Sequence, residues 1–348
     1  MDPRRVLLIF AVCSFAIWLL DACVRDEATS RGDDQIYELM AQDPATTHTF
    51  PFAYRVLVPT IVHVLPFGHT FSFSLLAWLC SGGAGAITYV LLRRFAVREA
   101  LAAAIGLILA TSPGLLVVSL RDGRNTDAAT VFLMLLAVLL MVDRRPRALA
   151  ATLLVAALTR ESAMFLVPLT YALWAARPVD VDAARLTAVV CAPAVTVYAA
   201  LRLGIPTVGR EQVLGYGEGL IEGRIENLRR GLDRWTTEGR RIFTQFGPLW
   251  LVAPLALRDT PFVRRGLVLF AGCLVSMTFA LDWGRMMLLA APVVVVAAGV
   301  VLQRHGRRVV VPVLVGCALL NVGYAVHMHR TGVAEGIDNN SLPPYPVR

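Results

Sequence analysis

The chain has 348 residues, of which 57% are hydrophobic, and its mean hydropathy is +0.63. Soluble domains rarely have this composition, whereas polytopic membrane proteins usually do. The formal net charge is +8, and all 33 side chains counted as Lys or Arg are arginine. These arginines fall in short groups between apolar runs rather than on one continuous face, which argues against nucleic-acid binding.

Apolar runs follow one another along the whole chain. A membrane-spanning helix needs about 20 apolar residues, or fewer where neighbouring protein shields its ends. No small-residue cleavage site follows the first run, so we expect an uncleaved first helix. The pattern predicts one all-α, multi-pass transmembrane domain over residues 1–348. The eleven predicted helices are 6–24, 71–92, 99–119, 127–142, 148–159, 162–175, 185–203, 244–257, 266–281, 286–302 and 309–327.

The orientation follows from the arginine clusters, because short cytoplasmic loops collect positive charge. Arg4 and Arg5 precede the first run, so a cytoplasmic N-terminus predicts that alternate loops are basic. The remaining clusters obey this alternation, which predicts an inner (plasma) membrane protein with its N-terminus inside and its C-terminus outside. These clusters are Arg93, Arg94 and Arg98; Arg144, Arg145 and Arg147; Arg177 and Arg185; Arg258, Arg264 and Arg265; Arg304, Arg307 and Arg308.

The predicted extracytoplasmic loops have a different composition. The first, residues 25–55, contains six acids and three arginines. The run 56–67 that follows is too short to span, so we expect an interfacial or re-entrant helix. The loop 204–243 mixes Arg and Glu, and within it residues 219–238 predict an amphipathic helix on the membrane surface. The residues expected to face lipid there are Leu220, Ile221, Ile225, Leu228 and Leu232.

Arg160 and Glu161 lie between two of the shortest apolar runs, 148–159 and 162–175. A helix of that length covers roughly 20 Å and cannot cross a core of about 30 Å. Their shared turn is therefore predicted to lie below the outer surface, in a cavity open to that side. Ionisable groups at membrane depth are candidates for function. The structural alternative is an Arg–Glu or Arg–carbonyl clamp that closes the turn.

The outer loops combine arginine with carboxylates, which suits a phosphate-bearing substrate. Guanidinium groups bind phosphate oxygens in a bidentate fork, and a nearby carboxylate can act as a general base toward a hydroxyl. The chain contains neither of the glycine-rich nucleotide fingerprints, G-x-x-x-x-G-K-[ST] and G-x-G-x-x-G. A phosphate donor is therefore expected to be borne by a lipid and to reach the site from the bilayer.

The segment "DDQIYELMA", Asp33 to Ala41, resembles the "D-E-x-x-Y-x-x-x-A" segment that follows the first helix of GT-C membrane glycosyltransferases. The lipid-A aminoarabinose transferases and protein mannosyltransferases are of this kind. An N-in first helix, an acidic first outer loop and a charged turn before the fourth helix extend the similarity. A basic residue, Arg160 in "LTRES", also stands where the superfamily often has one.

The resemblance implies that Asp33 is the catalytic base, that Asp34 stands where Glu is common and that Tyr37 matches the family's Tyr. It also implies a polyprenyl-phosphate or dolichyl-phosphate sugar as donor. Asp33 and Asp34 equally suit the N-terminus of a helix, which is the structural alternative for them.

Three further outer segments carry candidates with two interpretations each. The turn 121–127 either contacts phosphate or is a solvated turn that caps the next helix. Arg55 is either a phosphate ligand or an interfacial anchor that extends outward. Asp282 and Arg285 either clamp the donor or form a local salt bridge. The predicted substrate-binding residues are Tyr37, Arg55, Arg121, Arg124, Asp127, Arg160, Glu161, Asp282 and Arg285.

The sequence thus predicts a glycosyltransferase that moves a sugar from a lipid phosphate to a hydroxyl on the extracytoplasmic side. Its expected partners are the lipid-linked donor and membrane lipids, with no assigned cofactor. A divalent cation between Asp33, Asp34 and Asp127 is left open, and a pair of headgroup-level histidines is favoured over a metal site at His327 and His329. The alternative functions are a transporter or flippase of a lipid-linked or anionic solute, and a membrane scaffold. The sugar, the acceptor and any protein partner are left undetermined.

Overall fold

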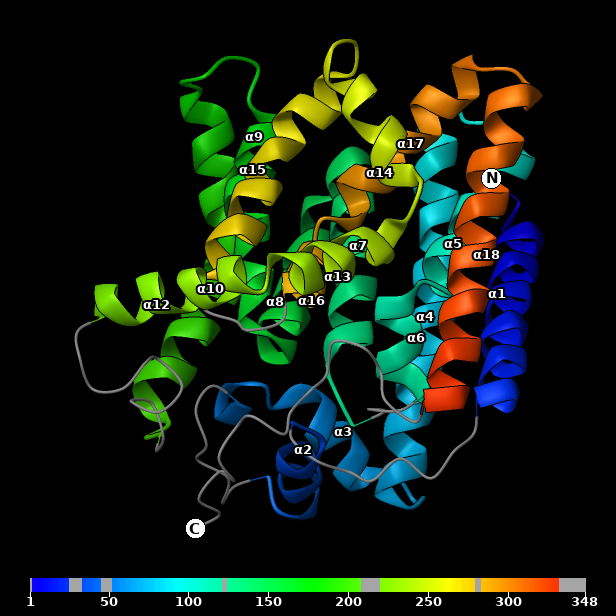
Figure 1. Cartoon of the computed structure of the whole chain (residues 1–348). Helices are drawn as coiled ribbons and strands as arrows, with labels where there is room; N and C mark the ends of the chain where they lie inside the picture. Colours follow the sequence, from blue (N-terminus) through cyan, green and yellow to red (C-terminus); the bar gives the residue numbers. More distant parts are fainter. Residues whose placement is uncertain are drawn as a thin grey trace.

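The computed structural model describes residues 2–24, 33–44, 52–120, 124–207, 220–278 and 283–331, apart from some side chains at helix ends. Every regular element in these ranges is a helix. Most of the helices run side by side between two ends of the molecule, as Figure 1 shows. The predicted all-α class is therefore confirmed for the described part of the chain.

Four helices in the described ranges are long and apolar enough to cross a membrane. A pair of helical segments, 249–257 and 261–277, is bent by 116° at the break between them and passes the same test when the two are taken together. The described residues thus have the helix lengths and composition of a helical membrane protein. The four long helices are α1 (Pro3–Val24), α4 (His69–Arg94), α10 (Val181–Gly204) and α18 (Arg307–Thr331).

The other elements are shorter and complete the bundle or lie at its ends. They are α2 (Asp33–Gln42), η1 (Phe52–Tyr54), α3 (Leu57–Val64), α5 (Glu99–Ala110), α6 (Pro113–Leu120), α7 (Asp127–Val142), α8 (Pro146–Thr159), η2 (Glu161–Phe165), α9 (Leu166–Trp174), α12 (Leu220–Asp233), α13 (Trp235–Phe246), α14 (Leu249–Val252), η3 (Ala253–Leu257), α15 (Pro261–Met277), α16 (Trp283–Leu288) and α17 (Ala291–Arg304).

Three helices predicted as continuous are broken, and each break comes just before a proline. The predicted helix 99–119 divides before Pro113 into α5 and α6. The predicted helix 244–257 is interrupted at Gly247, whose φ is +52°, and Pro248 follows. The predicted helix 286–302 divides before Pro292 into α16 and α17. Proline lacks the N–H that would continue a helix but suits the first turn of the next, so these predicted boundaries were wrong.

The centre of the bundle is α4, which packs against α1, α5 and α7. Its contact with α5 is close enough that a Cβ built on Gly106 would lie 2.5 Å from the carbonyl oxygen of Gly85. Small residues allow helix backbones to approach in this way, which is how membrane helices gain packing contacts. The valine-rich first half of α17 is also buried in this core.

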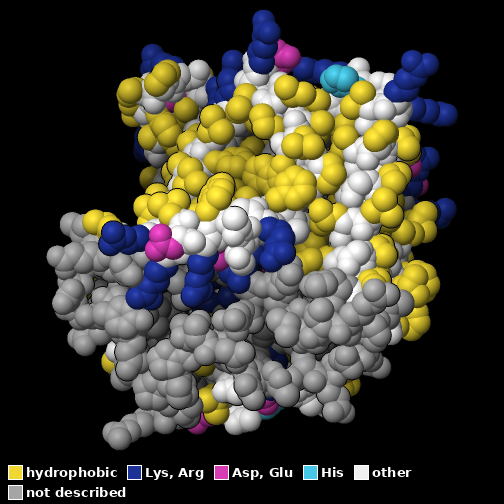
Figure 2. All heavy atoms as spheres, viewed as in Figure 1, with side chains coloured by type: hydrophobic (Ala, Val, Ile, Leu, Met, Phe, Trp, Pro, Cys, Tyr) yellow, Lys and Arg dark blue, Asp and Glu magenta, His cyan; other side chains and the backbone are white. Residues whose placement is uncertain are grey.

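The basic turns meet at one end of the molecule. Ion pairs and hydrogen bonds link turns that are far apart in the sequence, and Figure 2 shows arginines along the upper rim of the molecule. These turns therefore lie at the same end of the molecule. The links are Arg5 with Glu99, Arg94 with Asp143, Arg304 with Asp259, the backbone N–H of Arg98 with Gln303, and Arg265 with the carbonyl of Leu173.

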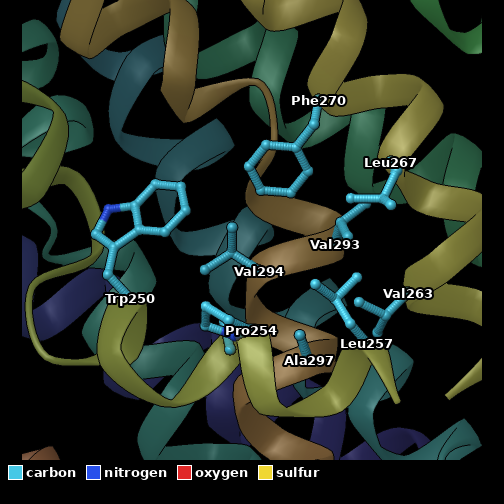
Figure 3. A pocket seen from close by; sticks show the side chains of 10 residues that line it. Trp250, Pro254, Leu257, Val263, Leu267, Phe270, Val293, Val294 and Ala297 are labelled. Atoms are coloured by element: carbon cyan, nitrogen blue, oxygen red, sulfur yellow. The ribbon is translucent and has the colours of Figure 1, made fainter. Parts of the chain in front are cut away.

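A band of hydrophobic side chains lies below this rim in Figure 2. Exposed residues such as Leu251, Leu267 and Leu319 would meet water in a soluble protein and hydrocarbon in a membrane. Within the bend between η3 and α15, Figure 3 shows a recess bordered by Trp250, Phe270 and other apolar side chains. With no polar side chain in its lining, this recess offers surface to lipid rather than groups for catalysis.

Candidate functional site

Arg55 follows η1 in the first predicted outer loop and points into the protein, where only 5% of the residue is exposed. Its Nε donates to Glu161 Oε2 at 3.0 Å, and its Nη2 donates to Glu161 Oε1. Its Nη1 donates to the hydroxyl of Tyr37 at 2.8 Å. The fork is bidentate, the strongest geometry for an arginine and a carboxylate. The interpretation of Arg55 as an outward anchor was therefore wrong.

Arg160 contacts the carboxylate of Asp127, at the first residue of α7. The side chains of both are less than a tenth exposed. Arg285 on α16 donates from Nη1 to the other carboxylate oxygen of Asp127, Oδ2, at 3.3 Å. Asp127 thus lies between two arginines that come from different parts of the chain. We name the five residues Arg55, Asp127, Arg160, Glu161 and Arg285 the arginine–carboxylate network.

The local sequence explains how Arg160 and Glu161 separate. Helix α8 ends at Thr159, and Arg160 is extended, with φ −162° and ψ 145°. Glu161 then begins the short η2 helix. Successive side chains of extended backbone point in opposite directions, so Arg160 reaches α7 while Glu161 reaches Arg55. They bind separate partners, so the Arg–Glu form of the predicted clamp was wrong.

The first turn of α7 is fixed by Asn125. Its side-chain oxygen accepts from the backbone N–H groups of Thr126 and Asp127, at 2.6 and 3.2 Å. The Thr126 hydroxyl lies 3.3 Å from the hydroxyl of Tyr37. Asn125 therefore satisfies the end of the helix, which leaves the Asp127 carboxylate to hold the two arginines.

A second group of charges lies beside the network, on α2, at the start of α4 and in the turn before α7. Glu38 Oε2 accepts from Arg124 Nη1 at 3.2 Å, and Glu38 Oε1 lies 3.0 Å from Nδ1 of His69. Glu38 follows Tyr37 on α2, and His69 begins α4. These contacts tie α2 to the turn before α7 and to the start of α4. The sequence pattern singled out Arg124 but not Glu38 or His69, whose partners are distant in the chain.

Several predicted residues cannot be placed in full. Asp33 and Asp34 form the start of α2, one helical turn before Tyr37, but their side chains lie outside the described residues. Arg121 and Asp282 also lie outside the described residues. His327 and His329 belong to α18, and their side chains are likewise not described. The structure therefore gathers seven of the predicted residues around α2 and the start of α7, in groups of contacts that are joined through residues adjacent in the chain: Tyr37, Arg55, Arg124, Asp127, Arg160, Glu161 and Arg285.

Two buried polar groups beside the network have no hydrogen-bond partner within the described residues. They are the side-chain nitrogen of Asn125 and the hydroxyl of Ser162. A buried donor without a partner costs about 1–3 kcal/mol, so each marks a place where a bound ligand oxygen would be favourable. Their proximity in sequence to Asp127 and Glu161 was the only signal that could have identified them.

The arginine–carboxylate network itself has an excess of positive charge. The arginine–carboxylate network contains three guanidinium groups and two carboxylates, which gives these five residues a net charge of +1. Charges taken out of water are tolerated only when they are paired and hydrogen-bonded. Among the described side chains, no group of three or more His, Cys, Asp or Glu could hold a metal ion, although the carboxylates of Asp33 and Asp34 are outside that set.

The fold and site define a helical membrane-type protein with a charged cluster gathered at one end of its helices. No protein-family model matches the chain. No curated protein matches it either.

Proposed function

We propose that the protein is a GT-C-like glycosyltransferase of the plasma membrane that moves a sugar from a polyprenyl phosphate to a hydroxyl acceptor on the extracytoplasmic side. The observation that carries the proposal is the arginine–carboxylate network, which lies beside the helix that bears Asp33 and Asp34. The carboxylates and arginines of the site therefore come from the first loop, α7, the α8–α9 turn and α16 together.

The position of the network supports this orientation. Helix α7 begins at Asp127 in the network and ends at Val142, next to the basic turn 143–147. Helix α8 begins at that turn and ends at Thr159, next to Arg160. The network and the basic turns thus occupy opposite ends of the same helices. By the positive-inside rule the network faces outward, in a topology of about eleven passes with the N-terminus inside and the C-terminus outside.

The base in this mechanism is Asp33, or Asp34 if the family motif aligns one residue later. Both precede Tyr37 by about one helical turn, and residues spaced in that way share a face. Tyr37 is held by Arg55 at 2.8 Å. The hydrogen bond fixes the rotation of α2 and so sets the direction of its first turn relative to the network.

The arginines divide into two groups by exposure. Arg55 and Arg160 have side chains only 6% and 7% exposed and are engaged with carboxylates. Arg285 and Arg124 are also paired with carboxylates, those of Asp127 and Glu38, but their side chains are more exposed, at 19% and 22%. We assign binding of the donor phosphate to Arg285 and Arg124. Arg55 and Arg160 hold the surrounding segments in place through their carboxylate partners. The sequence motif predicted that Arg160 contacts the phosphate directly. In this proposal Arg160 instead supports the site by binding Asp127.

The reaction balances as a displacement at the anomeric carbon. The acceptor oxygen forms a bond to that carbon while the bond from the carbon to the phosphate oxygen breaks. The acceptor proton goes to the Asp33 carboxylate, and the polyprenyl phosphate leaves with the bonding electrons. The leaving oxygen gains charge in the transition state, so arginines already in position lower the barrier.

The test is release of polyprenyl phosphate from a panel of polyprenyl-phosphate hexoses and pentoses in membranes that contain the chain. Asp33→Asn and Asp34→Asn remove a base and keep its shape, and loss of the true base should lower the rate roughly 10²–10⁴-fold. Asp259→Asn is the control, since Asp259 is exposed at the opposite end with Arg304. If both loop variants are folded and as active as the parent, the glycosyltransferase proposal is wrong and transport becomes the better hypothesis.

One observation already weighs against transport. The charged side chains that are buried within the described ranges are Arg55, Asp127, Arg160 and Glu238. Three belong to the network, and Glu238 bonds to the backbone of Trp283, two residues before Arg285. A carrier of an ionic solute would be expected to have polar groups along a path near the membrane midplane.

A further inference from the structure

Helices α12 and α13 carry an exposed apolar stripe. Ile225, Leu228 and Leu232 are separated by three and four residues, so they lie on one face of α12, and all three are exposed. Trp235, at the start of α13, is 58% exposed. A stripe of this kind requires an apolar partner, because water disfavours a continuous apolar surface.

Arginines lie beside the stripe. Arg229 follows Leu228, Arg234 precedes Trp235, and both arginines are exposed. Residues 220–246 contain six arginines and four acids. One of those acids, Glu238, forms an ion pair with Arg241, which leaves five arginines and three acids in the segment. The surface therefore presents positive charge next to apolar side chains.

The placement of these helices matches a water–lipid boundary. Figure 1 shows α12 and α13 lying across the bundle rather than along it. In Figure 2 a row of arginines follows these helices at the lower border of the hydrophobic band. A helix in the plane of a membrane places its apolar face among the acyl chains and its arginines at the level of the headgroups.

We propose that α12 and α13 form an interfacial binding surface for anionic phospholipids, with the stripe inserted among acyl chains and Arg229 and Arg234 bound to headgroup phosphates. Charge complementarity selects anionic lipid over zwitterionic lipid, since the apolar stripe alone would accept either. This lipid-binding role does not depend on glycosyl transfer.

The surface is also connected mechanically to the charged site. The backbone N–H of Trp283 donates to Glu238 Oε2 at 3.1 Å. A Cβ built on Gly231 would lie 2.0 Å from the Trp283 ring, so α12 packs directly on this indole. Arg285, two residues after Trp283, binds Asp127. Lipid that holds α12 and α13 in place therefore restrains the segment that positions Arg285.

The first measurement is quenching of Trp235 by brominated lipids in nanodiscs, taken as the emission of the parent minus that of Trp235→Phe. Brominated phosphatidylglycerol in phosphatidylcholine is compared with brominated phosphatidylcholine in phosphatidylglycerol at equal mole fraction. The anionic lipid should be enriched about fivefold near each basic residue and so quench more strongly. Arg229→Gln/Arg234→Gln should remove the difference, and Arg307→Gln/Arg308→Gln, at the opposite end, should preserve it.

The second measurement is hydrogen–deuterium exchange over residues 283–290. Exchange should be slower in discs with phosphatidylglycerol than in discs of phosphatidylcholine alone, and the Arg229→Gln/Arg234→Gln protein should show no such difference. Unquenched Trp235 would mean that water or a protein partner covers the stripe and would overturn the proposal. Equal quenching by both lipids in the parent would overturn the anionic selectivity.

Discussion

Arg160 binds Asp127 and not its neighbour Glu161. The side chains of Arg160 and Asp127 are each less than a tenth exposed. The two charges that stand side by side in "LTRES" therefore bind two different segments of the chain. Arg160 joins the end of α8 to the start of α7, while Glu161 joins it to the first loop through Arg55. The same turn holds together three segments of the candidate site.

The first prediction concerns Asp127→Asn. This change leaves Arg160 and Arg285 without their shared carboxylate, and breaking a buried pair typically costs about 3–5 kcal/mol. We expect a lower unfolding temperature of the purified protein in detergent. Asp143→Asn, which removes the partner of the more exposed Arg94, should cost no more than about 1 kcal/mol. If the two variants lower the unfolding temperature equally, the Asp127 pairs contribute no more stability than the more exposed Arg94–Asp143 pair.

The second prediction is coupling between Arg55 and Glu161. A double-mutant cycle with Arg55→Gln and Glu161→Gln should give an interaction energy of roughly 1–3 kcal/mol, because the two residues share two hydrogen bonds away from water. Arg55→Lys keeps the charge but loses the fork, so it should recover only part of the stability. Additive single-variant effects in denaturant unfolding would contradict this interpretation.

Much of the helical framework is predictable from apolar runs. The helix predicted at 127–142 has those boundaries in the structure, since an acid begins it and charged residues end it. Pro113, Pro248 and Pro292 could have predicted the three breaks. The residues around each proline are apolar, so each stretch was predicted as one continuous helix. The contacts of the charged site were harder to predict. Whether Arg160 pairs with Asp127 or with Glu161 depends on how α7 packs against α8, which the sequence does not show.

The third prediction tests the close approach of α4 and α5. Gly106→Ala would place a methyl group 2.5 Å from the backbone oxygen of Gly85, so the helices must separate. Forced overpacking typically costs about 1–3 kcal/mol. Gly323→Ala in α18 is the matched control, since its Cβ position has no heavy atom of the described residues within 4 Å, apart from its own stretch of helix. The control should be neutral or slightly stabilising because alanine favours helix. Similar unfolding temperatures for both variants would refute the close contact.

The fourth prediction is a pH effect at the start of α10. Hydrogen bonds from the backbone N–H groups of Ala183 and Ala176 lower the pKa of Asp180. A lowered folded-state pKa adds stability above the unfolded value of about 3.9, and this stability is lost as the pH falls through the folded value. The unfolding temperatures of the parent and Asp180→Ala should therefore differ at neutral pH and begin to converge below about pH 4. A difference that stays constant down to pH 3 would show that ionisation of Asp180 is irrelevant.

The last prediction concerns the orientation of the two ends. Arg145 and Arg308 lie at the basic end and are exposed, and Arg234 is exposed on the surface beside the network. If arginine clusters mark the cytoplasm, these residues lie on opposite sides of the membrane. In a chain whose native cysteines are replaced by serine, Arg234→Cys should react with a membrane-impermeant maleimide on intact cells. Arg145→Cys and Arg308→Cys should react only after the membrane is permeabilised. The reverse pattern would place the network in the cytoplasm, where a lipid-linked donor on the outer leaflet could not reach it, and the proposed reaction would have to be abandoned along with the orientation.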